Sequence, residues 1–297
     1  MQHAEIVVPG SISNLGPSFD ALSVAVQLYL RVRVVERRDD ASDTIDWEFA
    51  GAGPSGENRI DSAYRLARSR IGVRAPGLRV RVESDIPQTA GLGSSAAAAV
   101  AGLRLYESIA GRRPDEEWLA LATELEGHPD NAAAALLGGL TVCCQSDDGR
   151  IVARSSLWPD DLRLVVATPD MGLHTSEARR VLPKEVPLRD AIFNLQRALL
   201  FVRALDSGRY EDLREAMRDR WHQPARAPLV PGLAEAMAFD DDAALGVCLS
   251  GAGPSILVLA TAAGVATVTR LLGDLYKRLG LACTIRALSA HNSNRSI

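Results

Sequence analysis

The chain lacks any long hydrophobic run, and this excludes one large class of proteins. Its most apolar stretches, residues 256–263 and 96–103, are far shorter than the roughly 18 to 20 residues that cross a bilayer. The first five residues have neither the basic start nor the apolar core of a secretory signal. We therefore expect a cytoplasmic protein with no membrane partner.

An excess of one charge and a cysteine framework are also missing. The 33 Lys and Arg nearly balance 37 Asp and Glu, and the basic residues are mostly arginines scattered along the chain, so nucleic acid is not an expected partner. Of the four cysteines, Cys143 and Cys144 are adjacent and Cys248 lies in an apolar segment, and none has metal-ligand spacing. Buried, reduced thiols are expected rather than disulfides or a zinc site.

What is present is enough chain for a sizeable core. With 297 residues, 47% of them hydrophobic, the sequence can form one large or two ordinary domains. Apolar patterns predict strands and helices that mix without a strict βαβ rhythm, which indicates an α+β fold. In the first half the strands are expected at 6–8, 28–35, 78–82, 139–144 and 163–167, and the helices at 61–71, 94–109 and 115–125.

The second half begins after a turn. Residues 158–161, Trp-Pro-Asp-Asp, predict a boundary, so we expect domains over 1–160 and 161–290 and a loose polar tail over 291–297. The patterns after the turn predict helices at 191–205, 210–219 and 265–279 and strands at 244–249, 256–259 and 284–288.

The most informative segment is the run Gly91–Ala99, in which two glycines and two serines precede small helix-forming residues. A helix that begins near Ser94 leaves its first N–H groups unpaired, and the glycines let a phosphate approach the backbone. We therefore predict a phosphate site here; the alternative is that Ser94 or Ser95 only caps a tightly packed alanine helix. The run is neither a Walker A motif nor a dinucleotide fingerprint.

Two further segments concentrate polar side chains. The glycine- and proline-rich residues 9–20 predict a fixed loop after a strand that presents Asn14 and Asp20 near a cleft, although such a loop is more often only structural. Residues 126–131, Glu-Gly-His-Pro-Asp-Asn, join two predicted helices. Glu126 with the Ser95 hydroxyl would suffice for Mg²⁺, and the alternative is a polar turn in which Asp130 or Asn131 is an N-cap.

A last segment, Ser250–Ser255, is a glycine turn between two apolar strands. Its small residues would allow it to approach phosphates or a substrate from the second domain, but an ordinary β-turn explains it as well. His128 is expected to be a local hydrogen-bonding residue, because no second histidine lies at ligand spacing.

Taken together, these motifs make the chain resemble the GHMP small-molecule kinases. Members of that family share a proline-rich first motif, a Gly-Leu-Gly-Ser-Ser-Ala phosphate loop and a C-terminal glycine-rich motif, which stand here in that order at 9–20, 91–96 and 250–255. The likeness is greatest to the homoserine kinases of the family, and four segments carry it: 126–131, 178–183, 222–226 and 229–232.

The resemblance implies a two-domain fold, with an N-terminal domain like ribosomal protein S5 domain 2, a ferredoxin-like C-terminal domain, and ATP and substrate between them. It implies transfer of the ATP γ-phosphoryl group to the side-chain hydroxyl of L-homoserine, giving O-phospho-L-homoserine for threonine biosynthesis. The alternatives are another GHMP kinase that acts on a related hydroxy amino acid or hydroxy acid, and a non-catalytic nucleotide-binding relative.

The resemblance also assigns residues. It implies that Ser95 and Glu126 hold Mg²⁺, that Asp20 receives the substrate ammonium, and that the arginines receive its carboxylate; Asp130 is only a weak candidate for a base. The triphosphate would be lined by Pro87, Gly91, Leu92, Gly93, Ser94, Ser95 and Ala96, and the substrate by Asn14, Asp20, Asn131, Arg179 and Arg226. The C-terminal loop contributes Ser250, Gly251, Ala252 and Gly253.

Some positions depart from the family pattern. Gly10, Ser18 and Ser23 replace residues usual in the first motif, and Ala90 and its neighbours lack an arginine common before the phosphate loop. These departures affect the substrate assignment more than the family. A homodimer is ordinary for an enzyme of this size, although no stripe in the sequence identifies an interface.

Overall fold

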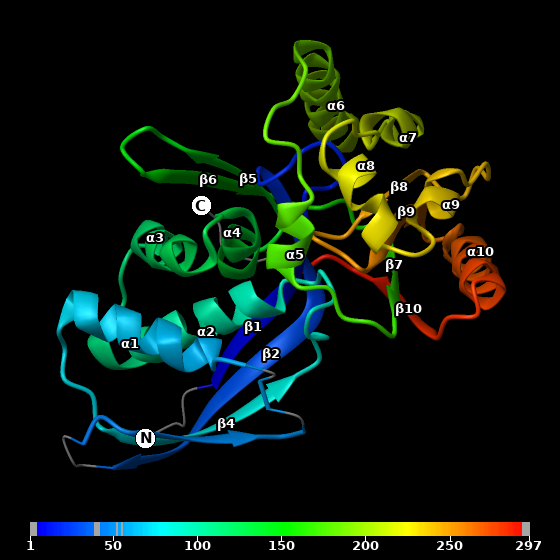
Figure 1. Cartoon of the computed structure of the whole chain (residues 1–297). Helices are drawn as coiled ribbons and strands as arrows, with labels where there is room; N and C mark the ends of the chain where they lie inside the picture. Colours follow the sequence, from blue (N-terminus) through cyan, green and yellow to red (C-terminus); the bar gives the residue numbers. More distant parts are fainter. Residues whose placement is uncertain (1–4, 39–41, 52, 55, 293–297) are drawn as a thin grey trace.

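The computed structural model describes residues 5–38, 42–51, 53–54 and 56–292, which form two β-sheets with helices packed on them (Figure 1). The first sheet has six strands, and β2 (Leu22–Arg38) is its longest. One edge of β2 pairs with β1 (Glu5–Ser13), and the other pairs in turn with β4 (Gly77–Ser84) and β5 (Leu140–Gln145). The outer strands are β3 (Ile45–Phe49) and β6 (Ile151–Ser156), and the β3–β4 pair alone in this sheet is parallel among the described strands.

Four helices cover this sheet. They are α1 (Arg59–Ile71), α2 (Ser94–Ala110), α3 (Asp115–Glu126) and α4 (Asp130–Leu137). α2 and α4 pack against β1 and β2, while α1 packs along α2 and α3 packs against both α2 and α4 (Figure 1). A Cβ at Gly102 would lie 2.1 Å from the carbonyl oxygen of Ile60, so α1 and α2 approach at a distance that only small residues permit.

The second sheet has the strand order β10-β7-β9-β8 and is antiparallel throughout. Its strands are β7 (Leu162–Pro169), β8 (Gly246–Leu249), β9 (Ile256–Thr261) and β10 (Cys283–Leu288). A helical region lies between β7 and β8, and α10 (Val265–Arg278) between β9 and β10 packs on the sheet. This β-α-β-β-α-β order is the ferredoxin-like arrangement, and the predicted α+β, two-domain fold is confirmed.

The helical region between β7 and β8 contains one long helix, α6 (Leu188–Ser207), and several short ones. The short helices are α5 (Thr175–Arg180), η1 (Tyr210–Asp212), α7 (Leu213–Ala216), α8 (His222–Arg226), η2 (Ala227–Leu229) and α9 (Leu233–Met237). The prediction of one helix over 210–219 is therefore wrong, because the segment forms a 3₁₀ turn followed by a single α-helical turn. The Asp219 carboxylate then accepts from the N–H groups of Trp221 and Gln223 in the next segment.

The loop expected over 9–20 is also wrong in its first half. β1 continues through Ser13, and only a register shift between Pro9 and Gly10 marks the position where the sequence suggested a loop. Proline and glycine are tolerated at such a bulge because the ladder is already interrupted there. β3 and β6 were not predicted.

One hydrophobic core runs through both sheets. Its buried members include Val24 from β2, Trp158 from the connecting turn and Leu164 and Leu257 from the second sheet. A second, smaller cluster lies between the second sheet and α10. The two halves therefore stabilise each other.

The start of the expected loose tail is fixed on the first sheet. The backbone N–H of His291 donates to the carbonyl oxygen of Ala25, and the carbonyl oxygen of His291 accepts from the N–H of Gly139. The Asn292 side-chain amide accepts from the N–H of Trp158 and donates to its carbonyl oxygen. The first two residues of the expected tail therefore have fixed partners, His291 through its backbone and Asn292 through its side chain. Residues 293–297 lie outside the described residues.

Two other expectations can be compared with the structure. The four cysteines are free, with Cys143 and Cys248 buried, but Cys144 is exposed because it points to the other face of β5. Within the described ranges, no helix is both long enough and apolar enough to cross a membrane.

Candidate functional site

A cavity of about 350 Å³ lies where the helical layer of the first sheet meets the segments of the second. Segments far apart in the sequence form its wall: the 14–20 loop, the phosphate loop, the 126–131 turn, α5 and the glycine loop before β9. The predicted residues that line it are Asn14, Asp20, Gly91, Gly93, Ser94, Ser95, Ala96, Glu126, Asp130, Asn131, Arg179, Arg226, Gly251 and Ala252.

The phosphate loop is held from both sides by backbone contacts. Gly91 and Gly93 have φ angles of 75° and 72°, which glycine adopts without strain. A Cβ on Gly91 would lie 2.2 Å from the carbonyl oxygen of Ser250, and the Ser250 hydroxyl donates to the carbonyl of Gly91 over 2.7 Å. The backbone N–H of Ser11 on β1 donates to the carbonyl oxygen of Leu92. The loop therefore opens toward the cavity with its backbone fixed.

The α2 helix begins at this loop without a side-chain cap. Its N-cap is Gly93, so the idea that Ser94 or Ser95 caps the helix is wrong. The first N–H groups of α2 and the positive end of its dipole are thus left for an anion in the cavity.

The Ser95 hydroxyl instead donates to Glu126 Oε1 over 2.7 Å. The Glu126 carboxylate is only 7% exposed, and Arg59 Nε lies 3.5 Å from the same oxygen. A buried carboxylate joined to a hydroxyl at a helix N-terminus supplies hard oxygen donors of the kind that Mg²⁺ takes together with phosphate oxygens. The donor set fits the predicted ion.

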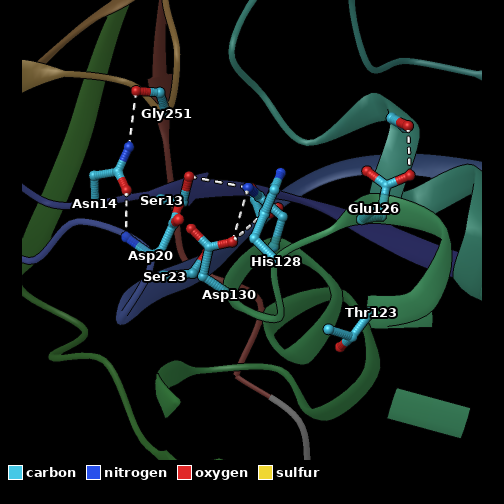
Figure 2. A network of polar contacts seen from close by, with 12 residues as sticks. Ser13, Asn14, Asp20, Ser23, Thr123, Glu126, His128, Asp130 and Gly251 are labelled. Atoms are coloured by element: carbon cyan, nitrogen blue, oxygen red, sulfur yellow. Dashed lines mark hydrogen bonds and ion pairs between the residues drawn. The ribbon is translucent and has the colours of Figure 1, made fainter. Parts of the chain in front are cut away.

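The turn after Glu126 holds a histidine–carboxylate pair. His128 Nδ1 lies 2.7 Å from Asp130 Oδ1 (Figure 2), and Asp130 is 1% exposed. Burial disfavours the charged form of His128, but the hydrogen bond and charge of Asp130 outweigh burial and raise the pKa of His128 above its ordinary value. The N-cap of α4 is Pro129, so the suggestion that Asp130 or Asn131 caps that helix is wrong.

Asn131 ties this turn to β1. Its Oδ1 accepts from Ser11 Oγ over 2.8 Å, and its Nδ2 donates to Ser13 Oγ over 3.0 Å. Both serines are buried, so the amide satisfies two hydroxyls that have little access to water. Its position lines the cavity, and its side chain is largely committed to the protein.

The 14–20 loop is shaped by residues that tolerate left-handed backbone. Asn14 and Asp20 have φ angles of 72° and 57°. Asn14 Nδ2 donates to the carbonyl of Gly251 and its Oδ1 accepts from the N–H of Asp20 (Figure 2). The Asp20 carboxylate meets Arg179 in a two-pronged ion pair, with distances of 2.7 and 3.1 Å. The two predicted substrate residues of opposite charge thus contact each other.

Arg226 is the buried cation of the site. The residue is 1% exposed. Its Nε donates to the carbonyl oxygen of Ala178, and its Nη1 donates to His222 Nδ1 and to the carbonyl oxygen of Gly251. Among the described residues no carboxylate lies within ion-pair distance of it. Burial, and next the nearby Arg179, lower the pKa of Arg226 to about 10, which leaves it charged at neutral pH.

Two carboxylates and an imidazole gather in the same cavity. One ligand atom each of Asp20, His128 and Asp130 lies within 4.8 Å of the others. Such a cluster favours a cation, and a primary ammonium fits it as well as a metal ion does.

Four predicted residues do not line the cavity. Leu92 is buried in the core, Pro87 lies before the loop, and Ser250 and Gly253 support the phosphate loop from behind. Reasoning from the sequence missed several lining residues, namely Ser13, Phe19, Arg59, Thr89, Leu173, His174, Thr175 and Ser176. Arg59 is one arginine among many, and only the packing of α1 on α2 brings it to Glu126. Ser13 and Phe19 are exceptions, since both lie inside the first motif.

Comparisons with known proteins agree with this geometry. The model of the GHMP kinases N terminal domain matches residues 58–139, and that of the GHMP kinases C terminal region matches residues 201–276. The homoserine kinase of Thermus thermophilus is 43% identical over 274 residues, which cover 92% of each chain. That of Aquifex aeolicus is 40% identical over 259 residues and 86% of each chain.

Solved structures show the same fold. A homoserine kinase from Cytophaga hutchinsonii superposes with a TM-score of 0.85 at 23% identity, covering 99% of this chain and 96% of that one. A galactokinase from Lactococcus lactis complexed with galactose superposes with a TM-score of 0.74 at 13% identity, covering 98% and 94%.

Proposed function

Since this chain belongs to the GHMP kinase family, we propose that it is a homoserine kinase. It transfers the γ-phosphoryl group of ATP to the side-chain hydroxyl of L-homoserine and releases ADP and O-phospho-L-homoserine. Relatives of that name, matched over most of their length, support this choice within the family.

The observation that carries the proposal is the charge pattern of the cavity. Arg226 is a buried cation that contacts no described carboxylate, and the free N–H groups of α2 form a second anion site in the same cavity. The carboxylates of Asp20 and Asp130 line the same cavity. An α-amino acid brings a carboxylate and an ammonium together, and a nucleotide brings the phosphates.

Substrate binding in this proposal exchanges one ion pair for two. The ammonium of homoserine contacts Asp20, and its carboxylate contacts Arg179 and Arg226. A substrate with a carboxylate but no ammonium would take Arg179 away from Asp20 and leave that carboxylate without a partner, which is unfavourable in a closed cavity. This favours an amino acid over mevalonate-like hydroxy acids.

The triphosphate lies along the phosphate loop, with the N–H groups from Gly93 to Ala96 directed at it. Ser95 and Glu126 hold Mg²⁺, which neutralises charge on the phosphates when it is bound. As the substrate oxygen forms its bond to the γ-phosphorus, the bond from that phosphorus to the ADP oxygen breaks. The hydroxyl proton leaves late in a loose transition state, so positioning accounts for most of the acceleration, and Asp130 stays a candidate for receiving the proton.

The test is ADP release by the purified protein with Mg-ATP and a panel of L-homoserine, L-threonine, L-serine, mevalonate, shikimate and galactose. Turnover confined to L-homoserine, and lost in Glu126→Ala, is expected. Turnover with another member would keep the fold and mechanism and change the substrate. No turnover, with ATP still bound by calorimetry, would favour a non-catalytic binder.

We also propose that the protein is a homodimer in the cytoplasm that binds neither nucleic acid nor membranes. Its free cysteines and its nearly balanced charge support the compartment and the lack of a nucleic-acid partner. The support for a dimer is an exposed apolar stripe on α6 at helical spacing, which consists of Leu188, Ile192, Leu195 and Leu199, exposed by 77, 46, 61 and 65%.

A second copy would cover this stripe with the same apolar residues on both sides, as a two-fold interface requires. Sedimentation should give a dimer that Leu195→Glu dissociates and Leu281→Glu, on another surface, does not. A monomer at 100-micromolar concentration, or a dimer insensitive to Leu195→Glu, would contradict this interface.

A further inference from the structure

His222 is buried completely, yet each nitrogen of its ring has a specific partner. Nε2 lies 2.6 Å from the carbonyl oxygen of Gly16, and Nδ1 lies 3.2 Å from Nη1 of Arg226. Phe19 packs against the ring, with centroids 5.2 Å apart. The imidazole therefore lies between the 14–20 loop and the buried arginine.

These partners determine the protonation of the ring. A guanidinium can only donate, so Nδ1 must accept; a carbonyl oxygen can only accept, so Nε2 must carry the hydrogen. His222 is thus a neutral imidazole in one tautomer. Burial, which outweighs the charge of Asp219, lowers the pKa of His222 and agrees with this assignment.

The contacts close a ring of hydrogen bonds across the two halves of the molecule. The carbonyl of Gly251 accepts from both Asn14 Nδ2, over 2.9 Å, and Arg226 Nη1, over 3.2 Å. His222 joins Arg226 to Gly16 in the same loop as Asn14. The loop from the first sheet and the arginine from the second are therefore fixed relative to each other.

The ring also fixes which part of Arg226 is left for a ligand. Its Nε donates to the carbonyl oxygen of Ala178, and its Nη1 donates to His222 Nδ1 and to the carbonyl oxygen of Gly251. The side chain also lines the cavity. Among the described residues, Nη2 has no hydrogen-bond partner. Rotation of the guanidinium away from His222 would turn Nη2 away from the position that a substrate carboxylate takes.

We propose that His222 is a positioning residue for substrate binding: it holds Arg226 and the 14–20 loop in the register that the amino-acid carboxylate and ammonium require. This inference rests on the proposed function. The phosphate loop and Glu126 have no hydrogen bond to His222, so nucleotide binding should be independent of it.

The experiment compares three variants in steady-state kinetics with homoserine and ATP varied separately. His222→Leu removes both contacts and should raise the KM for homoserine more than tenfold while the KM for ATP changes less than twofold. His222→Asn places an acceptor near Nδ1 and should recover most of the loss. His222→Gln retains only the donor near Nε2 and should recover less than His222→Asn.

A matched control separates positioning from stability. Val268→Ala removes two buried methyl groups from α10, which packs on the second sheet away from the cavity, and should lower the melting temperature without changing either KM. Equal changes in both KM values for the His222 variants, or no difference between the Asn and Gln variants, would overturn the proposal. If His222→Leu does not fold, the Asn and Gln comparison decides. Absence of homoserine turnover by the unmodified protein would instead refute the proposed function.

Discussion

Replacing Gly91 by alanine tests whether the phosphate loop depends on a close approach between two glycine turns. The residue has φ 75°, and a Cβ there would lie 2.2 Å from the carbonyl oxygen of Ser250 and 2.9 Å from that of Gly253. Both contacts are with backbone atoms, so no side chain can rotate away. Alanine must therefore push the phosphate loop and the 250–255 turn apart.

Three terms set the size of the expected loss in stability. A left-handed conformation costs an L-residue about 1 to 2 kcal/mol. Overpacking adds about 1 to 3 kcal/mol, and alanine recovers about 0.4 to 1 kcal/mol by restricting the unfolded chain. We expect a net loss of about 3 kcal/mol, which lowers Tm by about 6 to 12 °C for a chain of this size.

Gly72→Ala is the matched control. Gly72 has φ 80° at the end of α1, but nothing lies within 4 Å of a Cβ there, so only the conformational term applies. Its expected loss is about 1 kcal/mol, or about 2 to 4 °C. Thermal melts followed by circular dichroism measure both. Equal losses in the two variants would refute the claim that close contact, and not the φ angle alone, requires glycine at Gly91.

Three further predictions follow from the site and its surroundings. Arg179→Lys should raise the KM for homoserine about tenfold, roughly 1.4 kcal/mol. The Arg179 guanidinium contacts the Asp20 carboxylate through two nitrogens and can bind the substrate carboxylate in the same two-pronged way, which an ammonium cannot; an unchanged KM in steady-state assays would argue against that substrate contact. Asn131→Ala should lower the free energy of unfolding by about 2 to 4 kcal/mol in urea titrations, since two buried serine hydroxyls lose their partner; a loss below 1 kcal/mol would show that water replaces it. Burial lowers the pKa of His291, so its stabilisation is complete above the ordinary histidine pKa and lost as pH falls below it. His291→Asn should therefore flatten the fall in Tm between pH 7 and pH 5, and an unaltered slope would contradict this.

The local elements that the sequence predicted well share a physical basis. β4 alternates buried Leu78, Val80 and Val82 with exposed arginines, and its strand pattern reflects burial on one face alone. α2 begins where glycine gives way to serine and alanine, because backbone freedom ends there. Gly91 and Asn14, which have positive φ angles, could also be predicted as loop residues, because glycine and asparagine tolerate that backbone conformation.

The short helices and edge strands were less accessible. β3 does carry a strand signal, since its residues Ile45–Phe49 alternate between apolar and acidic, but no local pattern shows that it pairs in parallel with β4. The exposed stripe of α6 was not identified either, because helical spacing alone cannot distinguish a face that packs inward from one that faces solvent.

By itself the sequence determined the α+β class, the anion-binding loop before α2 and the set of charged residues, because backbone freedom, apolar periodicity and side-chain chemistry are local properties. Only the tertiary structure decided that Asp20 pairs with Arg179, that Arg59 reaches Glu126, and that His222 joins Arg226 to Gly16. These contacts join residues that are far apart in the chain or belong to different sheets. They depend on how helices pack and on how the two sheets share one core, which no local pattern specifies.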